Sequence, residues 1–222
     1  MHFFFYIKDL IADFLFPKDR KVLEIEALST ETLLDILPPA EPIKDSYTMA
    51  LFDYSHPLVK EIVWELKYRG NIKMADKLGI ILSDVIEHEL RNLALFESAG
   101  WQMEKLLLMP VPISDKRRFE RGWNQSELLA KQILRCSEKT FKYLPRQLIK
   151  VRHTESQTKT ASRSERTKNL TDSMRVLNPS LVAGKYVIVL DDVTTTGSTF
   201  TEARRALHAA GVKKILCVAV AH

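Results

Sequence analysis

Two adjacent acids, Asp191 and Asp192, stand between a short apolar run and a segment of hydroxyl side chains with one glycine. Carboxylates in such a place can accept hydrogen bonds from vicinal hydroxyls, or hold Mg²⁺ directly or through water. The hydroxyls are hydrogen-bond donors, and the glycine lets a phosphate approach the backbone closely. These capacities together predict a phosphorylated ribose as the ligand. The loop that follows the acids is Val193, Thr194, Thr195, Thr196, Gly197, Ser198 and Thr199.

A buried strand and a helix are predicted to hold this loop. Residues 187–190 are continuously apolar, as in a parallel strand that is covered on both faces. Thr199 and Glu202 have the spacing of a capping box for a helix that Gly211 would end. The helix N-terminus would offer free backbone N–H groups and the positive end of its dipole to an anion. A second apolar run, 215–221, completes a strand–loop–helix–strand unit. The plainer alternative is a polar turn with a good helix cap and no ligand.

The composition is that of an ordinary soluble globular protein, with 222 residues, 45% apolar and 27% charged. A net charge of +5 suits a phosphorylated small molecule and a nucleic acid equally. Cys136 and Cys217 are the only cysteines, which excludes a disulfide framework and a cysteine-based zinc site. We therefore expect a cytoplasmic protein.

The N-terminal segment 1–16 is rich in apolar residues, but Lys8, Asp9 and Asp13 interrupt it. It has neither a basic leader nor a cleavage site, so we expect no signal peptide and no membrane span. Its helical periodicity predicts an amphipathic helix that docks on its own domain or on a twin subunit, in preference to a membrane surface. We expect a helical extension and connector over 1–45, with one short helix near Thr30–Leu37, and a catalytic domain over 46–222.

Alternating strands and helices are predicted for the catalytic domain, which makes the fold class α/β. The strands are expected at 50–54, 105–109, 187–190 and 215–221, and the main helices at 56–67, 73–92, 124–135 and 200–210. Lys67 and Arg69 end the first of these helices. They are either cations that complement the helix dipole or contacts to a pyrophosphate, and the sequence leaves both readings open.

A rigid proline turn, Pro110–Asp115, follows the second strand, and four cations gather just after it in residues 116–121. Such cations usually mark a solvated helix end. Open α/β sheets, however, bind ligands at the carboxyl ends of their strands. This placement favours contacts to phosphate or pyrophosphate.

The polar stretch 151–176 carries six cations against three acids, with many serines and threonines. It is predicted to be a mobile loop without an ordered core. The functional interpretation is a lid that excludes water from a reactive intermediate. The alternatives are a plain solvated linker or a helix near Ser162–Asn169. His153 lies in this loop as a candidate general base, although a lone loop histidine is more often incidental.

The order of these segments resembles the ComF-like family of type I phosphoribosyltransferases, whose members are often linked to natural competence and DNA uptake. The resemblance rests on DFLFP (13–17), LKYRG (66–70), MPVPISDKRRFERGWNQSELLA (109–130), the RxTxSQ and RxxRxxN patterns (152–169) and DDVTTTGST (191–199). One departure is that Lys18 follows the FP pair where family members commonly begin a four-cysteine zinc module.

The resemblance implies a Rossmann-like type I phosphoribosyltransferase fold, with a central, mainly parallel sheet flanked by helices and a helical N-terminal extension. It implies that Asp191 and Asp192 are the catalytic pair, that they hold the ribose hydroxyls of phosphoribosyl pyrophosphate and Mg²⁺, and that residues 193–199 complete its binding site. The expected pyrophosphate contacts are Lys67, Arg69, Val111, Pro112, Ile113, Arg117 and Arg121. The expected flexible-loop residues are Arg152, Gln157, Arg163, Arg166 and Asn169.

Three functions follow from this reading. The preferred one is Mg²⁺-dependent transfer of a phosphoribosyl group to a base or an amine, by a homo-oligomeric enzyme. The second is a sensor that binds the sugar phosphate without turnover, because a fold does not fix a function. The third is an accessory protein for DNA handling that binds single strands through residues 116–121 and the basic loop.

Overall fold

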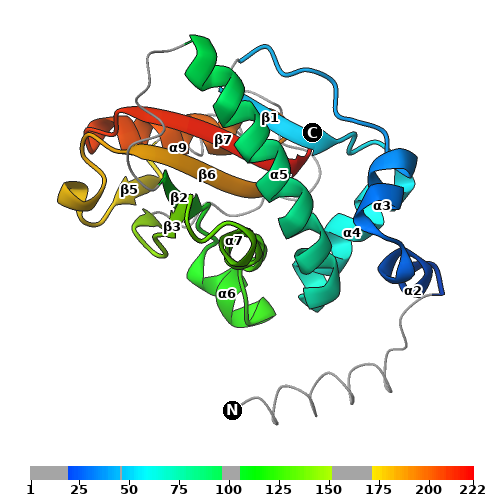
Figure 1. Ribbon diagram of the computed structural model, residues 1–222. Helices are drawn as coiled ribbons and strands as arrows, with labels where there is room; N and C mark the ends of the chain where they lie inside the picture. Colours follow the sequence, from blue (N-terminus) through cyan, green and yellow to red (C-terminus); the bar gives the residue numbers. More distant parts are fainter. Residues whose placement is uncertain (1–19, 46, 97–105, 152–171) are drawn as a thin grey trace.

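The computed structural model describes residues 20–45, 47–96, 106–151 and 172–222 (Figure 1). Its centre is a five-stranded sheet in the order β1-β7-β6-β2-β3, in which every neighbouring pair is parallel. A separate antiparallel ribbon pairs β4 with β5. The strands are β1 (Thr48–Phe52), β2 (Leu106–Pro110), β3 (Phe141–Tyr143), β4 (Leu148–Lys150), β5 (Met174–Val176), β6 (Tyr186–Val193) and β7 (Lys214–Ala221).

Helices cover both faces of the sheet and make a three-layer α/β fold (Figure 1). The helices are α2 (Arg20–Ala27), α3 (Thr30–Ile36), α4 (Pro57–Trp64), α5 (Ile72–Phe96), α6 (Asp115–Arg121), α7 (Gln125–Cys136) and α9 (Ser198–Ala209), with a π-helical turn η1 (Glu65–Arg69) and a 3₁₀ turn η3 (Pro179–Leu181). In the described ranges no helix is long and apolar enough to cross a membrane.

The alternation of side chains along β6 explains the two cores. Ile188 and Leu190 are fully buried on the face that α4, α5 and α7 cover. Val187 and Val189 are equally buried on the opposite face, against α9 and the β4–β5 ribbon. A strand buried on both sides needs a continuous apolar run, which is the pattern from which the sequence predicted it.

Several predicted elements are confirmed, and their ends differ by a few residues. Gly211 has φ +78° just after α9, so the predicted left-handed helix end is confirmed. The helix predicted over 56–67 is α4 continued by the π turn, and Gly70 ends it with φ +60°. β6 runs on through Asp191 and Asp192 to Val193, although we expected the strand to end before the acids.

Two predictions of irregular structure are wrong. The connector was expected to hold one short helix, but α2 precedes α3, and both bury apolar residues (Ile25 and Leu33) in the core with α4 and α5. The loop expected over 151–176 ends in strand β5, where Met174 is 1% exposed. Helix α2 and strand β5 are both short, and they become stable by packing on the main domain. Local sequence periodicity does not reveal such packing.

Candidate functional site

The candidate site lies where two neighbouring strands, β2 and β6, end side by side. β2 leads on to β3 on one side of the sheet, and β6 leads on to β7 on the other. The loops after β2 and β6 therefore diverge at this point, which is where open α/β sheets bind ligands. The backbone N–H of Val111 donates to Leu190 O at 2.8 Å and ties the two strand ends together.

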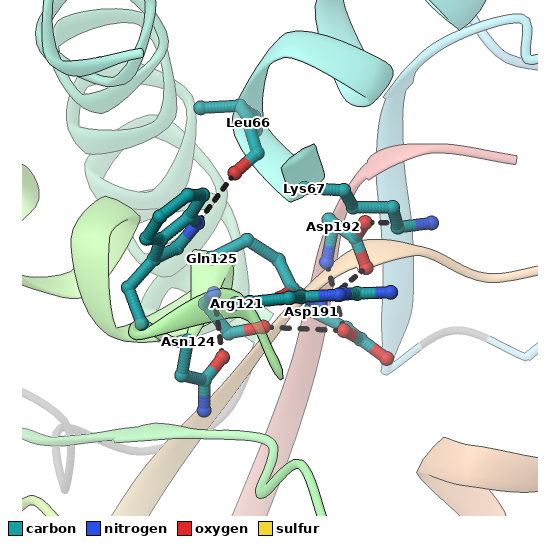
Figure 2. A network of polar contacts seen from close by, with 9 residues as sticks. Leu66, Lys67, Arg121, Asn124, Gln125, Asp191 and Asp192 are labelled. Atoms are coloured by element: carbon teal, nitrogen blue, oxygen red, sulfur yellow. Dashed lines mark hydrogen bonds and ion pairs between the residues drawn. The ribbon is translucent and has the colours of Figure 1, made fainter. Parts of the chain in front are cut away.

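The acid pair occupies the end of β6 and is almost covered, with Asp191 8% and Asp192 4% exposed. Asp191 Oδ1 accepts hydrogen bonds from Ser126 Oγ at 3.2 Å and from the backbone N–H of Asp192 at 2.9 Å. Gln125 Nε2 donates to Asp192 Oδ1 at 3.4 Å. The two donor side chains begin α7, so its N-terminus faces the acids (Figure 2). The positive end of that helix dipole favours their negative charge.

Lys67 reaches the acid pair from the π turn η1, and its Nζ lies 2.8 Å from Asp192 Oδ2 (Figure 2). The contact is an ion pair whose geometry is not that of a hydrogen bond. This buried oxygen therefore has no aligned hydrogen-bond donor among the described residues. An extra residue in a helical turn commonly occurs at functional sites. Here the turn directs Lys67 to the acids. A buried carboxylate oxygen without a donor is costly unless a ligand completes it.

Burial raises the pKa of Asp191 well above its ordinary value, and the negative charge of Asp192 raises it further. Lys67 acts in the opposite direction but more weakly. The pair therefore holds a proton more readily than an exposed aspartate does. A cation placed between the two carboxylates would remove this penalty.

The loop between β6 and α9 forms an open cradle at the N-terminus of α9. Gly197 is the N-cap with φ +73°, and a Cβ at this position would point into open space. The predicted capping box is wrong: Glu202 does not turn back to the helix start, since it accepts a hydrogen bond from the backbone N–H of Met174 at 2.9 Å. The N-cap Gly197 therefore offers no side-chain acceptor to the start of α9, and the Ser198 N–H donates to Thr196 Oγ1 at 3.4 Å. The hydroxyls of Thr196 and Ser198 also form a hydrogen bond with each other at 2.9 Å.

The proline turn after β2 is held beside the acids by α7. Asn124 Nδ2 donates to Val111 O at 2.9 Å, and its Oδ1 accepts from the backbone N–H of Ser126 at 2.9 Å. Asn124 therefore caps α7 and positions the turn at the same time. Of the predicted pyrophosphate contacts in this turn, Val111 is buried, whereas Pro112 and Ile113 are half-buried.

The predicted cations fall into two groups. Arg69 forms an ion pair with Glu65 at 3.3 Å and lies over the Trp64 ring, and Arg121 lies over the Tyr68 ring. Both cations therefore have partners within the protein, which were not predicted. Lys67 faces the acids, while the Arg117 side chain has no hydrogen-bond or ion-pair partner among the described residues. Pyrophosphate contact by any of them stays a prediction.

Sequence reasoning missed two residues at this site, Gln125 and Ser126. Both lie inside the quoted segment 109–130, but a polar pair at a helix start normally faces water. Their burial, at 5% and 0% exposure, results from the packing of α7 on the sheet. His153 and the flexible-loop predictions (Arg152, Gln157, Arg163, Arg166 and Asn169) lie outside the described residues.

Comparison with known proteins agrees with this geometry. The family model described as "Phosphoribosyl transferase domain" matches residues 126–222 of this chain. The "DNA utilization protein YhgH" of Escherichia coli O6:H1 is 29% identical over 155 residues, which cover 70% of this chain and 63% of that protein. "Competence protein F" of Haemophilus influenzae is 32% identical over 109 residues, 49% of this chain and 46% of that protein.

The chain belongs to the ComF-like phosphoribosyltransferase family. "Competence protein ComFC" of Bacillus subtilis is a further relative, 27% identical over 150 residues that cover 68% of this chain and 53% of that protein. The parallel sheet with helices on both faces is accordingly the type I phosphoribosyltransferase fold. The match spans less than two thirds of the length of these relatives.

Proposed function

We propose that this protein binds phosphoribosyl pyrophosphate together with Mg²⁺ and transfers the phosphoribosyl group to a base or an amine. The observation that carries the proposal is the buried acid pair, in which Asp192 Oδ2 has the ion pair with Lys67 but no aligned hydrogen-bond donor among the described residues, beside a helix N-terminus whose N-cap is Gly197. A ribose hydroxyl would supply an aligned donor, and the 5′-phosphate would lie at the N–H groups that begin α9. The relatives named for competence and DNA utilization support a role of the product or the protein in that process.

The donor set also fits Mg²⁺, which prefers carboxylate oxygens and usually keeps waters and substrate oxygens as further ligands. Asp191 and Asp192 would hold it, and when bound it would neutralise the charge on the pyrophosphate. Among the described residues no group of three histidine, cysteine, aspartate or glutamate side chains gathers as a metal site. The acids alone are therefore an incomplete set, as expected for a metal whose other ligands come with the substrate.

The protein itself would act mainly by positioning and by charge stabilisation, since the transition state carries oxocarbenium character at C1 of ribose. Gln125, Ser126 and Asn124 would fix the acids and the proline turn relative to each other. Lys67 would balance the charge of Asp192 until the substrate and its cation arrive.

The direct test is Mg²⁺-dependent release of pyrophosphate across a panel of purine and pyrimidine bases. We expect release with at least one base, and its loss in Asp192→Asn but not in Asp84→Asn, which removes an exposed acid on α5. Release that persists in Asp192→Asn would contradict the role of the acid pair. Saturable binding of phosphoribosyl pyrophosphate without release would favour the sensor.

A second candidate function, binding of single-stranded nucleic acid, is favoured by four neighbouring planar groups on the surface, with the Trp64 and Tyr68 rings tilted by 39°. Arg69 lies 5.6 Å from the Trp64 ring centre, Trp64 lies 5.5 Å from Tyr68, and Arg121 lies 4.9 Å from the Tyr68 ring centre. The two rings are nevertheless 44% and 52% exposed. Exposed aromatic faces stack on bases, and flanking arginines attract the phosphate backbone.

This surface can be tested by fluorescence anisotropy with a labelled single-stranded oligonucleotide at two salt concentrations. Loss of one stacking ring should weaken binding roughly ten-fold in Tyr68→Ala, while Leu34→Ala, an exposed apolar residue on α3, should bind normally. Equal binding by both variants would remove this candidate. Because the Asp192 carboxylate is not one of these four planar groups, Asp192→Asn should leave oligonucleotide binding unchanged.

A further inference from the structure

The two backbone N–H groups that could close the π turn η1 on Leu66 O are both directed elsewhere. In an α-helix this oxygen accepts from residue 70, and in a π-helix it accepts from residue 71. Gly70 and Asn71 instead donate to Glu65 O, Asn71 at 3.3 Å. Leu66 is 0% exposed, so water cannot take their place. Because a buried carbonyl without a donor costs stability, Leu66 O needs a donor from another element.

Trp123 supplies that donor from the short link between α6 and α7. Its indole Nε1–H donates to Leu66 O at 3.0 Å. The ring also lies against Gly70, since a Cβ at this glycine would come within 2.8 Å of Trp123 Cε2. Gly70 has φ +60°, so the left-handed backbone and the nearby ring both favour glycine there. One hydrogen bond and one ring-to-backbone contact thus join Trp123 to the π turn.

The link that carries Trp123 is fixed at both ends. Gly122 ends α6 with φ +84°, and its N–H donates to Arg118 O at 2.8 Å. Asn124 is the N-cap of α7, and its side chain donates to Val111 O at 2.9 Å. Trp123 is therefore held between two capped helix ends, and its indole N–H is a fixed donor for the π turn.

These contacts close a circuit that includes the acid pair (Figure 2). Lys67 directly follows Leu66, and its Nζ lies 2.8 Å from Asp192 Oδ2. Gln125, two residues after Trp123, donates to the other oxygen, Asp192 Oδ1, at 3.4 Å. The Asp192 carboxylate is therefore held from the π turn on one side and from α7 on the other. The hydrogen bond between Trp123 and Leu66 fixes these two elements relative to each other.

We propose that Trp123 is a positioning residue for the acid pair, because it holds the π turn so that Lys67 reaches Asp192. The inference rests on the proposed function, in which this carboxylate receives the ribose hydroxyls and Mg²⁺. Trp123 need not touch the ligand, since its indole N–H is used by Leu66 O. It acts through Lys67, so its effect on ligand binding should disappear when the lysine is removed.

The test is a double-mutant cycle of Trp123→Phe and Lys67→Met, measured by calorimetric titration of phosphoribosyl pyrophosphate in Mg²⁺ buffer. Trp123→Phe keeps an aromatic ring beside Gly70 and removes the N–H. Affinity should fall roughly five- to ten-fold with Lys67 present, as for one lost hydrogen bond, and less than about two-fold in Lys67→Met. The matched control is Trp64→Phe, the same change in a ring that is 44% exposed. It should alter affinity less than about two-fold in both backgrounds.

Urea unfolding of the same proteins gives a second cycle that needs no ligand, and it decides alone where Lys67→Met abolishes binding. The stability lost in Trp123→Phe should be about half as large or less when Lys67→Met is also present. Lys67→Gln replaces Lys67→Met if the latter does not fold.

Equal effects of Trp123→Phe in the two backgrounds, on affinity or on unfolding, overturn the inference. An equal loss in Trp64→Phe also overturns it, because any ring near the turn would then serve. A wild type that binds no phosphoribosyl pyrophosphate but shows the coupled unfolding cycle refutes the proposed function and keeps the link between Trp123 and Lys67. If it binds none and the unfolding effects are additive, both fail.

Discussion

Two buried acidic groups flank the loop between β6 and α9: the pair Asp191 and Asp192, and Glu202. They differ in how many of their carboxylate oxygens accept hydrogen bonds. Glu202, on α9, accepts from Arg205 at two atoms, each at 2.8 Å, and from the backbone N–H of Met174. Its pKa is lowered: burial alone would raise it, but the hydrogen bonds from Arg205 and Met174 outweigh that effect. Asp192 has one oxygen without a donor, and the pKa of its neighbour Asp191 is raised.

The comparison separates an acid with a full set of hydrogen-bond donors from an acid pair without one among the described residues. Glu202 fixes the β4–β5 ribbon to α9, since its partner Arg205 also donates to Met174 O at 2.8 Å. The acid pair contacts α7 and Lys67 of η1, but it leaves two like charges side by side. A buried carboxylate with a full set of donors stabilises the fold, whereas an incompletely satisfied pair costs stability that a cation or hydroxyl can recover.

Removing the satisfied acid should have the largest effect on stability. Glu202→Gln keeps the shape but loses the charge that Arg205 and the Met174 N–H share. We expect a loss of about 2 kcal/mol in the free energy of unfolding, below the value for a fully buried pair because Arg205 is 41% exposed. Urea unfolding measures it.

The contrasting change is Asp192→Asn. It removes one of two like charges, so the free energy of unfolding should change by less than about 1 kcal/mol. If this variant lost as much stability as Glu202→Gln, the acid pair would be a structural cluster and the distinction between the two regions would fail.

A smaller effect is expected at the cradle, where Gly197 has φ +73° and open space beside it. Gly197→Ala should cost about 1–2 kcal/mol in stability through the left-handed backbone, and it should also weaken binding of ribose 5-phosphate. Thermal unfolding and calorimetry measure the two effects.

Gly211 provides the matched control at the other end of α9, with φ +78° and only an ordinary 3.6 Å contact for a new Cβ. Gly211→Ala should lose similar stability and keep its affinity for ribose 5-phosphate. Equal affinity losses in both variants would mean that the cradle does not contact the phosphate.

The smallest effect concerns pH. An acid with a raised native pKa keeps its proton when the unfolded chain has lost it, so stability falls as pH rises from about 4, the ordinary aspartate pKa, toward the native value. Asp191→Asn does not titrate. The stability of this variant relative to wild type should therefore increase with pH in Mg²⁺-free buffer, as measured by urea unfolding across pH 4 to 8. A difference that is constant or falls with pH would contradict the raised pKa.

The fold and the loop after the acids were predictable because their signals are local. The signals follow one another within a short segment: the apolar run of β6, the acids, and the glycines at 197 and 211. The apolar run indicates a buried strand, and the glycines indicate left-handed backbone at the ends of a helix. Glu202 was misassigned for the opposite reason. A capping box is a local pattern, and a tertiary partner, the Met174 N–H, overrode it.

The contacts that complete the site come from distant segments and could not be read in the same way. Lys67 reaches Asp192 only because the π turn redirects it, and Ser126 faces Asp191 only because α7 packs across the strand ends. Periodicity shows which face of a helix or strand is apolar, but it does not show which other element packs against that face.

The central claim is that the acid pair and the start of α9 form one site for phosphoribosyl pyrophosphate. Its most direct test is calorimetric titration of that compound into wild type and Asp192→Asn, each with Mg²⁺ and with a chelator. We predict saturable one-site binding to wild type that weakens without Mg²⁺ and falls roughly a hundred-fold in the variant. Binding of equal strength to wild type and Asp192→Asn, or no binding to wild type, would contradict the account.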